Sequence, residues 1–272
     1  MELVITLLEN GRNNTKKEIE METLYNINSL VFWEEKDLRI RRFIEDSMKE
    51  EIKSILLSQN PAWKFYQIEA PCLLPRDLVN PNYTNEDIWV QETKNDEVPL
   101  VLKPETTPSS YVYAQHLLNT NRCLPPFVVW QTSKSFRREQ DQVLKNMRLK
   151  EFYQQEFQCI YSADTLNDYQ EKVLESIRKM LEDLIALPTR IVESDRLPSY
   201  SLRTMDIEVW NEDKWMEICS ISKRTDFPQK ARFTVKSNVI EKDLLVLEIA
   251  LGVDRILYNY LKRIEKNITT NE

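Results

Sequence analysis

The stretch from Phe127 to Tyr161 holds residues whose types and spacing suit chemistry on a nucleotide and an amine. Two predicted strands and the charged loop between them carry these residues, which are Arg137, Glu139, Arg148, Phe152 and Glu156. Guanidinium groups bind phosphates through paired hydrogen bonds, and an aromatic ring stacks on a base. A carboxylate pairs with an ammonium group. The stretch therefore predicts a site for a nucleoside triphosphate and an amine.

The two strands that must present these side chains differ in their apolar patterns. Phe127–Trp130 is a continuous apolar run, which is typical of a strand buried on both faces. The second strand alternates, so Phe152 and Glu156 lie on one face while Tyr153 and Phe157 lie on the other. We therefore expect one sheet surface to hold both the base and the amine.

The composition excludes several kinds of chemistry. The chain has 272 residues, of which 42% are hydrophobic, enough for one large domain or a domain with a small appendage. Its only histidine, His116, excludes a histidine-rich metal site and disfavours a Ser-His-Asp triad. Its only glycines, Gly11 and Gly252, exclude the glycine-rich phosphate loops. The chemistry must therefore depend on carboxylates, arginines and a metal carried by the ligand.

Charge and cysteine usage indicate the compartment. The net charge of −7 gives no global basic field for nucleic acid. No apolar run is long enough to span a membrane, and no signal-peptide pattern precedes the first helix. We expect reduced thiols in a cytoplasmic protein, because no CxxC pair occurs among Cys72, Cys123, Cys159 and Cys219.

The order of predicted elements favours an α+β fold with a mostly antiparallel sheet flanked by helices, because consecutive strands are joined by tight turns. We expect helices at 36–59, 111–118 and 165–186, the last with Asp164 as its N-cap, and a C-terminal helix after residue 252. Residues 73–97 should form a loop. The expected strands lie at 3–8, 63–70, within 98–108, from 127, from 151, and at 204–210, 214–222 and 244–250.

Three segments together resemble the motifs of class II aminoacyl-tRNA synthetases. Helix 36–59, with a strand ending at Pro71, resembles motif 1, and the segment from Phe136 to Phe152 resembles motif 2. Gly252-Val-Asp-Arg, between an apolar strand and a helix, resembles motif 3. The resemblance implies an antiparallel sheet flanked by helices, activation of an amino acid by ATP, and a homodimer formed through motif 1. It implies an extension at 1–36, a catalytic domain at 37–272 and no anticodon-binding domain.

Within that class, the chain is most similar to the glycyl enzymes and has seryl-like segments. Leu102–Thr107 resembles the glycyl LRPETA segment, and Arg224-Thr-Asp226 fits the glycyl ADRTDYD segment. Asp206–Trp210 and Glu217–Ser222 are similar to segments of the seryl enzymes. The implied substrate is a small amino acid, glycine or serine.

By resemblance, phosphate binding falls to three arginines. Arg137 would hold the α-phosphate of ATP and the substrate carboxylate, and Arg148 and Arg255 would hold the γ-phosphate end. Arg137 and Arg255 are the implied catalytic residues. An in-line attack on the α-phosphorus needs charge neutralisation and positioning more than acid–base groups, so a chain with one histidine suffices.

The same resemblance assigns the rest of the ATP site. Phe152 would stack on adenine, and Glu139 would contact its exocyclic amine. Glu217, with Ser220 nearby, would support Mg²⁺.

The implied amino-acid site consists of Glu105, Glu156, Arg224, Glu248 and Ala250. Glutamates at the three matching positions surround the glycine amine in the glycyl enzymes, whereas Ala250 stands where those enzymes keep a serine. Glu248 is the one charged residue of an apolar strand and therefore needs a cationic partner. That partner is either a substrate ammonium or an internal arginine in a structural salt bridge.

The resemblance implies a role in protein biosynthesis: ATP-dependent formation of an aminoacyl-adenylate and transfer to tRNA or a tRNA-like acceptor. Two alternatives stay open. The chain could be a synthetase paralogue that charges a non-tRNA acceptor such as a carrier protein, or a non-catalytic binding or regulatory module.

Overall fold

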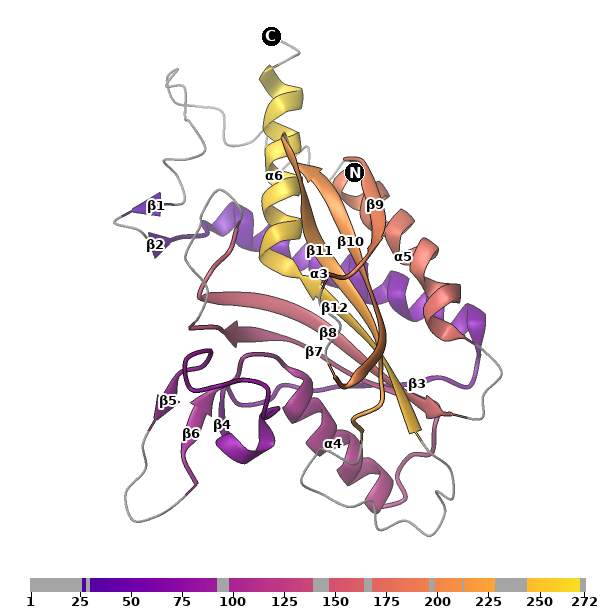
Figure 1. Cartoon of the computed structure of the whole chain (residues 1–272). Coiled ribbons are helices and arrows are strands. Elements are labelled where there is room, and N and C mark those ends of the chain that lie inside the picture. Colours follow the sequence, from indigo (N-terminus) through magenta and orange to yellow (C-terminus); the bar gives the residue numbers. More distant parts are fainter. Residues whose placement is uncertain are drawn as a thin grey trace.

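A long twisted sheet organises the computed structural model (Figure 1), which describes residues 26–27, 30–91, 98–138, 147–163, 168–195, 199–211, 213–227 and 244–269. Its seven strands follow the order β3-β7-β8-β12-β11-β10-β9. They are β3 (Lys64–Gln67), β7 (Phe127–Phe136), β8 (Glu151–Ser162), β12 (Leu244–Gly252), β11 (Lys214–Arg224), β10 (Ser201–Asn211) and β9 (Thr189–Glu193). The β3–β7 pair is parallel and the other five neighbouring pairs are antiparallel. This confirms the predicted α+β class.

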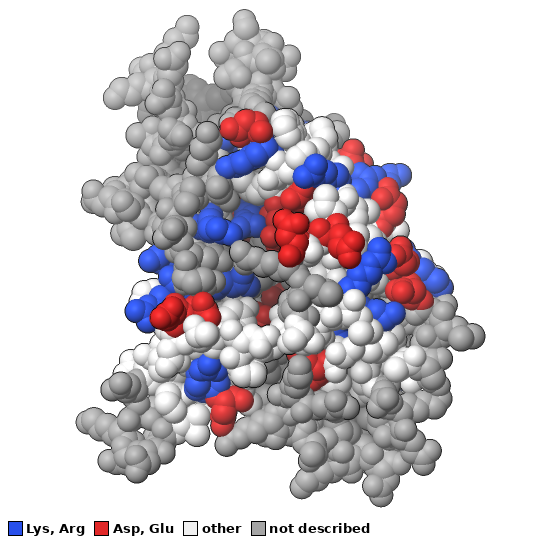
Figure 2. Space-filling view, in the orientation of Figure 1, with Lys and Arg blue, Asp and Glu red and all other residues white. Residues whose placement is uncertain are grey.

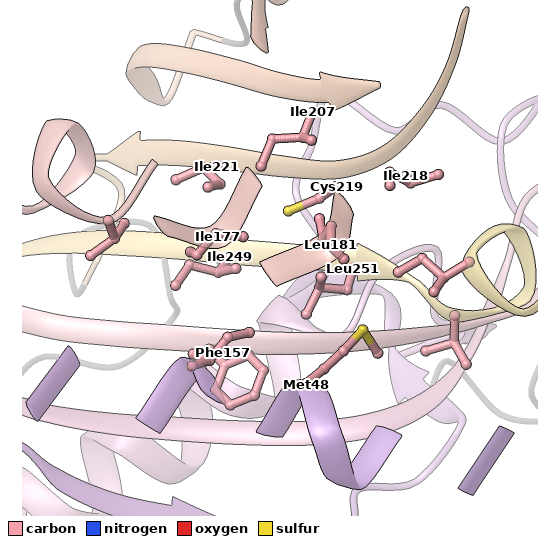
Figure 3. Close-up of a cluster of buried hydrophobic side chains, with 14 of the residues drawn as sticks. Met48, Phe157, Ile177, Leu181, Ile207, Ile218, Cys219, Ile221, Ile249 and Leu251 are labelled. Atoms are coloured by element: carbon pink, nitrogen blue, oxygen red, sulfur yellow. The ribbon is translucent and has the colours of Figure 1, made fainter. Parts of the chain in front are cut away.

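Helices α3 (Glu35–Gln59), α5 (Tyr169–Ile185) and α6 (Val253–Thr269) cover one face of the sheet and share one core with it. Helix α3 buries Ile44, Met48 and Ile52, which recur every fourth residue and so form one apolar stripe. Figure 3 shows Met48 lying toward Phe157 of β8, and Ile177 and Leu181 of α5 among residues of β11 and β12. This packing holds the sheet rigid behind its opposite face.

The opposite face carries helix α4 (Thr107–Asn119), which packs on β7, β8 and β12 through a second apolar cluster. Beside it lies a three-stranded sheet of β4 (Leu73–Pro75), β6 (Leu100–Leu102) and β5 (Val90–Gln91), with the 3-10 turn η1 (Arg76–Leu78). A separate pair, β1 (Asn26–Ile27) and β2 (Leu30–Val31), precedes α3. Helix α4 and the small sheet thus enclose part of the main sheet's second face.

The predicted alternation of β8 is confirmed. Phe157 and Tyr161 point into the core shared with the helices. The even-numbered residues of β8 therefore face α4, because neighbouring side chains along a strand point to opposite faces.

Two predicted helix starts and one predicted loop were wrong. Helix α4 begins at Thr107, four residues before the predicted start, and includes Pro108, a residue tolerated in a first helical turn. Helix α5 begins at Tyr169, because the carboxylate of Asp168 accepts hydrogen bonds from the backbone N–H groups of the first turn. Residues 73–97, predicted as loop, contain the strands β4 and β5.

Several sequence predictions lie outside the described residues. The predicted strand at 3–8 and the proposed cap Asp164 are among them.

The described surface mixes charges of both signs. Figure 2 shows lysine and arginine interleaved with aspartate and glutamate over the visible described part of one face. Within the described residues, no helix is both long and apolar enough to cross a membrane. All four cysteine thiols are unpaired, and three of them are buried.

The packing between the sheet and its helices predicts which substitution lowers the stability of the protein. Leu181→Ala removes a fully buried side chain and should lower the free energy of unfolding by about 2–5 kcal/mol, because a cavity remains. Urea denaturation measures this change. Leu202→Ala, at a side chain that is 59% exposed, is the matched control and should change stability by less than about 0.5 kcal/mol. Equal effects of the two substitutions would contradict this core.

Candidate active site

Three adjacent strands bring polar side chains to the face of the sheet that lies under α4. Register pairs Glu156 of β8 with Ala250 of β12, and Gln158 of β8 with Glu248 of β12. On the next strand, Ser220 is the partner of Ala250, so the three strands place these residues in neighbouring rows. Residues two apart on a strand share a face, so this register places both glutamates on the same surface.

A buried arginine links two of these strands. Arg224 of β11 is 1% exposed, and its guanidinium donates two hydrogen bonds to Asp226, at 2.7 and 3.1 Å. Its Nη1 donates to Oε2 of Glu248 on β12 at 2.7 Å. The guanidinium also lies 4.1 Å from the ring centre of Tyr200. Burial acts to lower the pKa of Arg224, but Glu248, Tyr111, Glu105 and Asp226 together outweigh it and the pKa is raised. Of the two partners considered for Glu248, the internal arginine is therefore present.

The first turn of α4 supplies the hydroxyl groups of the cluster. Thr107 Oγ1 donates to Oε2 of Glu248 at 2.8 Å and accepts from Gln158 at 3.2 Å and from Arg224 at 3.3 Å. Gln158 also donates to Glu248 at 2.8 Å. Thr107 and Gln158 therefore fix the carboxylate of Glu248 from two sides.

Glu156 lies deepest among the glutamates of the cluster, at 2% exposure. Its Oε2 accepts from Thr106 Oγ1 at 2.5 Å and, more weakly, from Thr107 and Gln158, each at 3.4 Å. Burial raises the pKa of Glu156 to about 8, and the charges of Glu248 and Glu105 add to the effect.

Glu105 reaches the cluster from the turn before α4. Its carboxylate accepts from the hydroxyl of Tyr83 at 3.3 Å. Burial raises the pKa of Glu105, while Arg224 acts to lower it.

A small cavity opens beside this cluster. Its volume is about 30 Å³, and Glu105, Thr107, Tyr111, Arg224 and Asp226 contribute to its wall. Carboxylates and a hydroxyl on the wall suit a small cationic group. The predicted amino-acid residues Glu105, Glu156, Arg224 and Glu248 are therefore brought together, with Ala250 on the adjoining strand position.

The predicted phosphate-binding residues form a second group. Arg137 lies with its guanidinium 5.4 Å from the ring centre of Phe152, and its Nε donates to the carbonyl of Pro104 at 3.2 Å. Burial lowers the pKa of Arg255, and the charges of Arg148 and Arg137 lower it further, whereas Glu217 opposes them. Arg137 and Arg148 therefore both lie close enough to Arg255 for their like charges to act on it, which is the charge arrangement that an anion would stabilise.

Glu217 lies at the edge of this group. Nη1 of Arg255 donates to the carbonyl of Glu217 at 2.8 Å and lies 3.9 Å from its carboxylate. The side chain of Glu217 is 53% exposed. Among the described residues no group of three or more His, Cys, Asp or Glu side chains could hold a metal. The remaining predicted ATP residue, Glu139, lies outside the described residues.

A buried aspartate at the start of α6 joins the two motifs that carry these arginines. Asp254 Oδ2 accepts from the backbone N–H of Tyr153 at 2.7 Å. The bond ties the residue beside Arg255 to the residue beside Phe152, so the arginine and the aromatic ring are held in a fixed relation.

Comparison with known proteins identifies the family of the chain. Residues 88–263 match the family described as tRNA synthetase class II core domain (G, H, P, S and T). The chain belongs to this family. Among curated relatives of this class II core, the glycine–tRNA ligase of Mycoplasma capricolum subsp. capricolum is 32% identical over 182 residues, which are 60% of this chain and 39% of the relative. The glycine–tRNA ligase of Macrococcus caseolyticus is 30% identical over 185 residues, which are 63% of this chain and 40% of the relative. The chain thus spans about two-fifths of the length of these relatives.

Solved class II synthetases share the fold. The prolyl-tRNA synthetase of Giardia lamblia, in complex with prolyl-adenylate, superposes with a TM-score of 0.65 at 15% identity, covering 85% of this chain and 47% of that one. The prolyl-tRNA synthetase of Cryptosporidium parvum superposes with a TM-score of 0.62 at 16% identity, covering 81% of this chain and 45% of that one. This similarity confirms the class II architecture of the core.

Sequence reasoning assigned no role to several residues of the class II site. They are Tyr83, Thr106, Thr107, Tyr111, Gln158, Tyr200 and Asp226. Thr106, Thr107 and Asp226 lie inside the glycyl-like segments, which was a usable signal. The even spacing of Gln158 from Glu156 was another. Tyr83 and Tyr200 offered none, because they come from loops whose fold the sequence does not specify, and Tyr111 was expected only as part of the helix at 111–118.

The buried cluster predicts a pH-dependent loss of stability in Arg224→Met. Removing the guanidinium leaves two carboxylates without a cation and should cost about 3–5 kcal/mol at pH 8. Acid neutralises buried carboxylates that have lost their cation, so the loss of stability should shrink as the pH falls toward 4. Urea denaturation across this range measures it. Arg203→Met removes an exposed ion pair with Glu171 and should cost about 0–1 kcal/mol at every pH. A pH-independent loss in Arg224→Met would contradict the buried charge cluster.

Proposed function

We propose that this class II core activates a small amino acid with ATP as the aminoacyl-adenylate and transfers it to tRNA or a tRNA-like acceptor. Glycine is the first candidate and serine the second. One observation carries the proposal: buried carboxylates gather around Arg224 at one end of the site, and at the other end the charges of Arg137 and Arg148 act on Arg255. An amino acid has matching ends, since its ammonium suits the carboxylates and its activated carboxyl belongs beside the phosphates. The curated glycine–tRNA ligase relatives support the same reading.

Cavity size favours a substrate with little or no side chain. The space beside Glu105 and Arg224 is about 30 Å³, enough for a few non-hydrogen atoms. Pro108 and Tyr111 of α4 close it on one side. A branched or aromatic amino acid would need these walls to move, which a packed helix resists.

Arginines would supply the positioning that the reaction needs. We assign Arg137 to the α-phosphate and the substrate carboxylate, and Arg148 and Arg255 to the γ-phosphate end. A substrate carboxylate oxygen forms a bond to the α-phosphorus while the bond to pyrophosphate breaks. Fixed positive charge stabilises the charge that develops on the phosphate oxygens, and no side chain has to accept a proton.

The remaining ATP contacts follow from the same placement. Phe152 would stack on adenine and Glu139 would contact its exocyclic amine. Glu217, with Ser220, would help to hold a Mg²⁺ that neutralises phosphate charge. Glu217 fits this role because its half-exposed carboxylate can reach a bound ion. Mg²⁺ takes one or two protein carboxylates, and phosphate oxygens and water complete its coordination.

Assembly and compartment belong to the same proposal. Residues 37–272 would form the catalytic domain, in a homodimer built through α3 and the chain that follows it. Unpaired thiols at all four cysteines support a reducing, cytoplasmic compartment.

Amino-acid-dependent exchange of pyrophosphate into ATP tests the activity. Glycine should support exchange, serine less well, and Arg137→Ala should lower the rate by about 10²–10³-fold because one fixed charge is lost from the transition state. Arg203→Ala, on the far side of β10 from the site, should leave exchange unchanged. No exchange with any of the twenty amino acids would refute the proposed activation, and ATP binding without exchange would favour a non-catalytic module.

Light scattering tests the dimer. The chain should have twice its monomer mass at micromolar concentration. Phe43 of α3, an apolar side chain with 44% exposure, fits a subunit contact, so Phe43→Glu should shift the mass toward the monomer. A monomeric mass for the unmodified chain would contradict the dimer.

A further inference from the structure

The amine site holds more buried acidic groups than its central cation can neutralise. Arg224 is engaged by Asp226 and Glu248, each at 2.7 Å. Glu105 and Glu156 share the same interior without an ion-pair contact to Arg224 as short as these. An ionised carboxylate in such surroundings is unfavourable unless a cation or a proton compensates its charge.

Glu156 is the least compensated of these groups. The hydrogen bonds to its carboxylate come from neutral donors: Thr106 at 2.5 Å, and Thr107 and Gln158 at 3.4 Å. Lys103 lies within electrostatic reach, but its own Nζ donates to the hydroxyl of Ser133 at 2.8 Å.

The other elements around Glu156 add mainly negative charge or neutral groups. Glu248 on β12 and Glu105 before α4 are acidic, and Arg224 on β11 and Lys103 are the opposing cations. On the neighbouring strands the register partners of Glu156 are Gln131 of β7 and Ala250 of β12, both uncharged. No partner among these described groups removes the need for compensation at Glu156.

We propose that Glu156 is the charge-compensating residue of the amine site, which carries a proton while the site is empty and releases it when a substrate ammonium binds. The inference rests on the proposed function, because it takes the ammonium to bind among these carboxylates. The O–H bond of Glu156 breaks, its electron pair stays on the carboxylate, and the proton passes to the solvent buffer. The ammonium keeps its three protons, so the total charge of the cluster is unchanged by the exchange.

The acidity of the group agrees with this exchange. Burial, together with Glu248 and Glu105, raises the pKa of Glu156 to about 8, although Thr106 and Arg224 act to lower it. A carboxyl group of that pKa is mostly protonated at pH 7. A bound cation would favour its ionised form, so binding and proton release are linked.

The linkage makes affinity depend on pH in a defined direction. Below the pKa of Glu156 each bound ammonium must displace a proton, so the dissociation constant should rise about tenfold for each pH unit lost between pH 7 and 6. At pH 9 the carboxylate is already ionised and the dependence should vanish. An uncharged analogue of the substrate cannot drive the exchange, so Glu156 would select for the protonated amine.

Titration calorimetry of glycine into the full chain counts the protons. At pH 6.5, in two buffers of different ionisation enthalpy, the chain should release about one proton per glycine, and close to none at pH 9. Glu156→Gln should release none at either pH. Glu193→Gln, at an exposed position on the edge strand β9, is the matched control and should behave as the unmodified chain.

The outcomes separate the inference from the function on which it rests. Glycine binding without proton release at pH 6.5 would overturn the role of Glu156 and leave amino-acid activation standing. No binding of glycine at any pH would count against the proposed substrate and remove the inference with it. The two-buffer measurement needs only the unmodified chain, so an absence of proton release at pH 6.5 overturns the inference even where Glu156→Gln fails to fold, and a release that persists in Glu156→Gln would assign the proton to another group such as Glu105.

A ligand-free measurement provides a second check. The folded pKa of Glu156 exceeds its unfolded value, so the unmodified chain loses stability relative to Glu156→Gln as the pH rises from about 4.5 toward 8. The melting temperature of Glu156→Gln minus that of the unmodified chain should therefore increase between about pH 4.5 and pH 8. Above pH 8 this difference should be constant. A constant difference between the two would overturn the proton on Glu156.

Discussion

The shared guanidinium of Arg224 is the interaction on which the substrate half of the site depends. It joins Glu248 of β12 to Asp226, just beyond the end of β11, and it hydrogen-bonds Thr107 at the start of α4. Three segments far apart in the sequence therefore meet at one buried charge. Leaving a partner unpaired in this interior costs several kcal/mol, so the strands and the helix are constrained to one arrangement. The cavity beside the cluster keeps its shape for the same reason.

A second buried contact has the same effect on the nucleotide half. Asp254 holds the backbone of Tyr153, and so the first turn of α6 is fixed against β8. Arg255 and Phe152 flank that contact in sequence. The apolar core under β8 keeps the strand itself in place. In this core the ring of Phe157 stacks on that of Trp130, with their ring centres 5.4 Å apart. The side chains proposed to bind the phosphates are thus mounted on rigid elements, as electrostatic stabilisation of a transition state requires.

The sequence allowed prediction of the strands and of what each presents, because alternation has a period of two and survives in any sheet. It placed Phe152 and Glu156 on one face, and it required a cation for Glu248. It could not show that the cation is Arg224, since 24 residues separate the pair and only the β11–β12 register brings them together. Thr107 reaches Glu248 across 141 residues of sequence, a contact that no local pattern encodes. The helix start at Thr107 was missed because Pro104 and Pro108 indicated a turn.

The polarity of the site explains why these two halves must be adjacent. A zwitterionic amino acid carries its ammonium and its carboxylate on the same carbon atom, so the groups of opposite sign that bind them must also lie close together. Arg137 lies at this boundary: its Nε bonds the carbonyl of Pro104, the residue before Glu105, while its guanidinium lies over Phe152. Its charge also acts on the carboxyl of Glu105. A single arginine thus faces the carboxylate cluster on one side and the phosphate-binding group on the other. An amino acid with its ammonium among the glutamates would have its carboxylate directed toward that arginine, where the α-phosphate is expected.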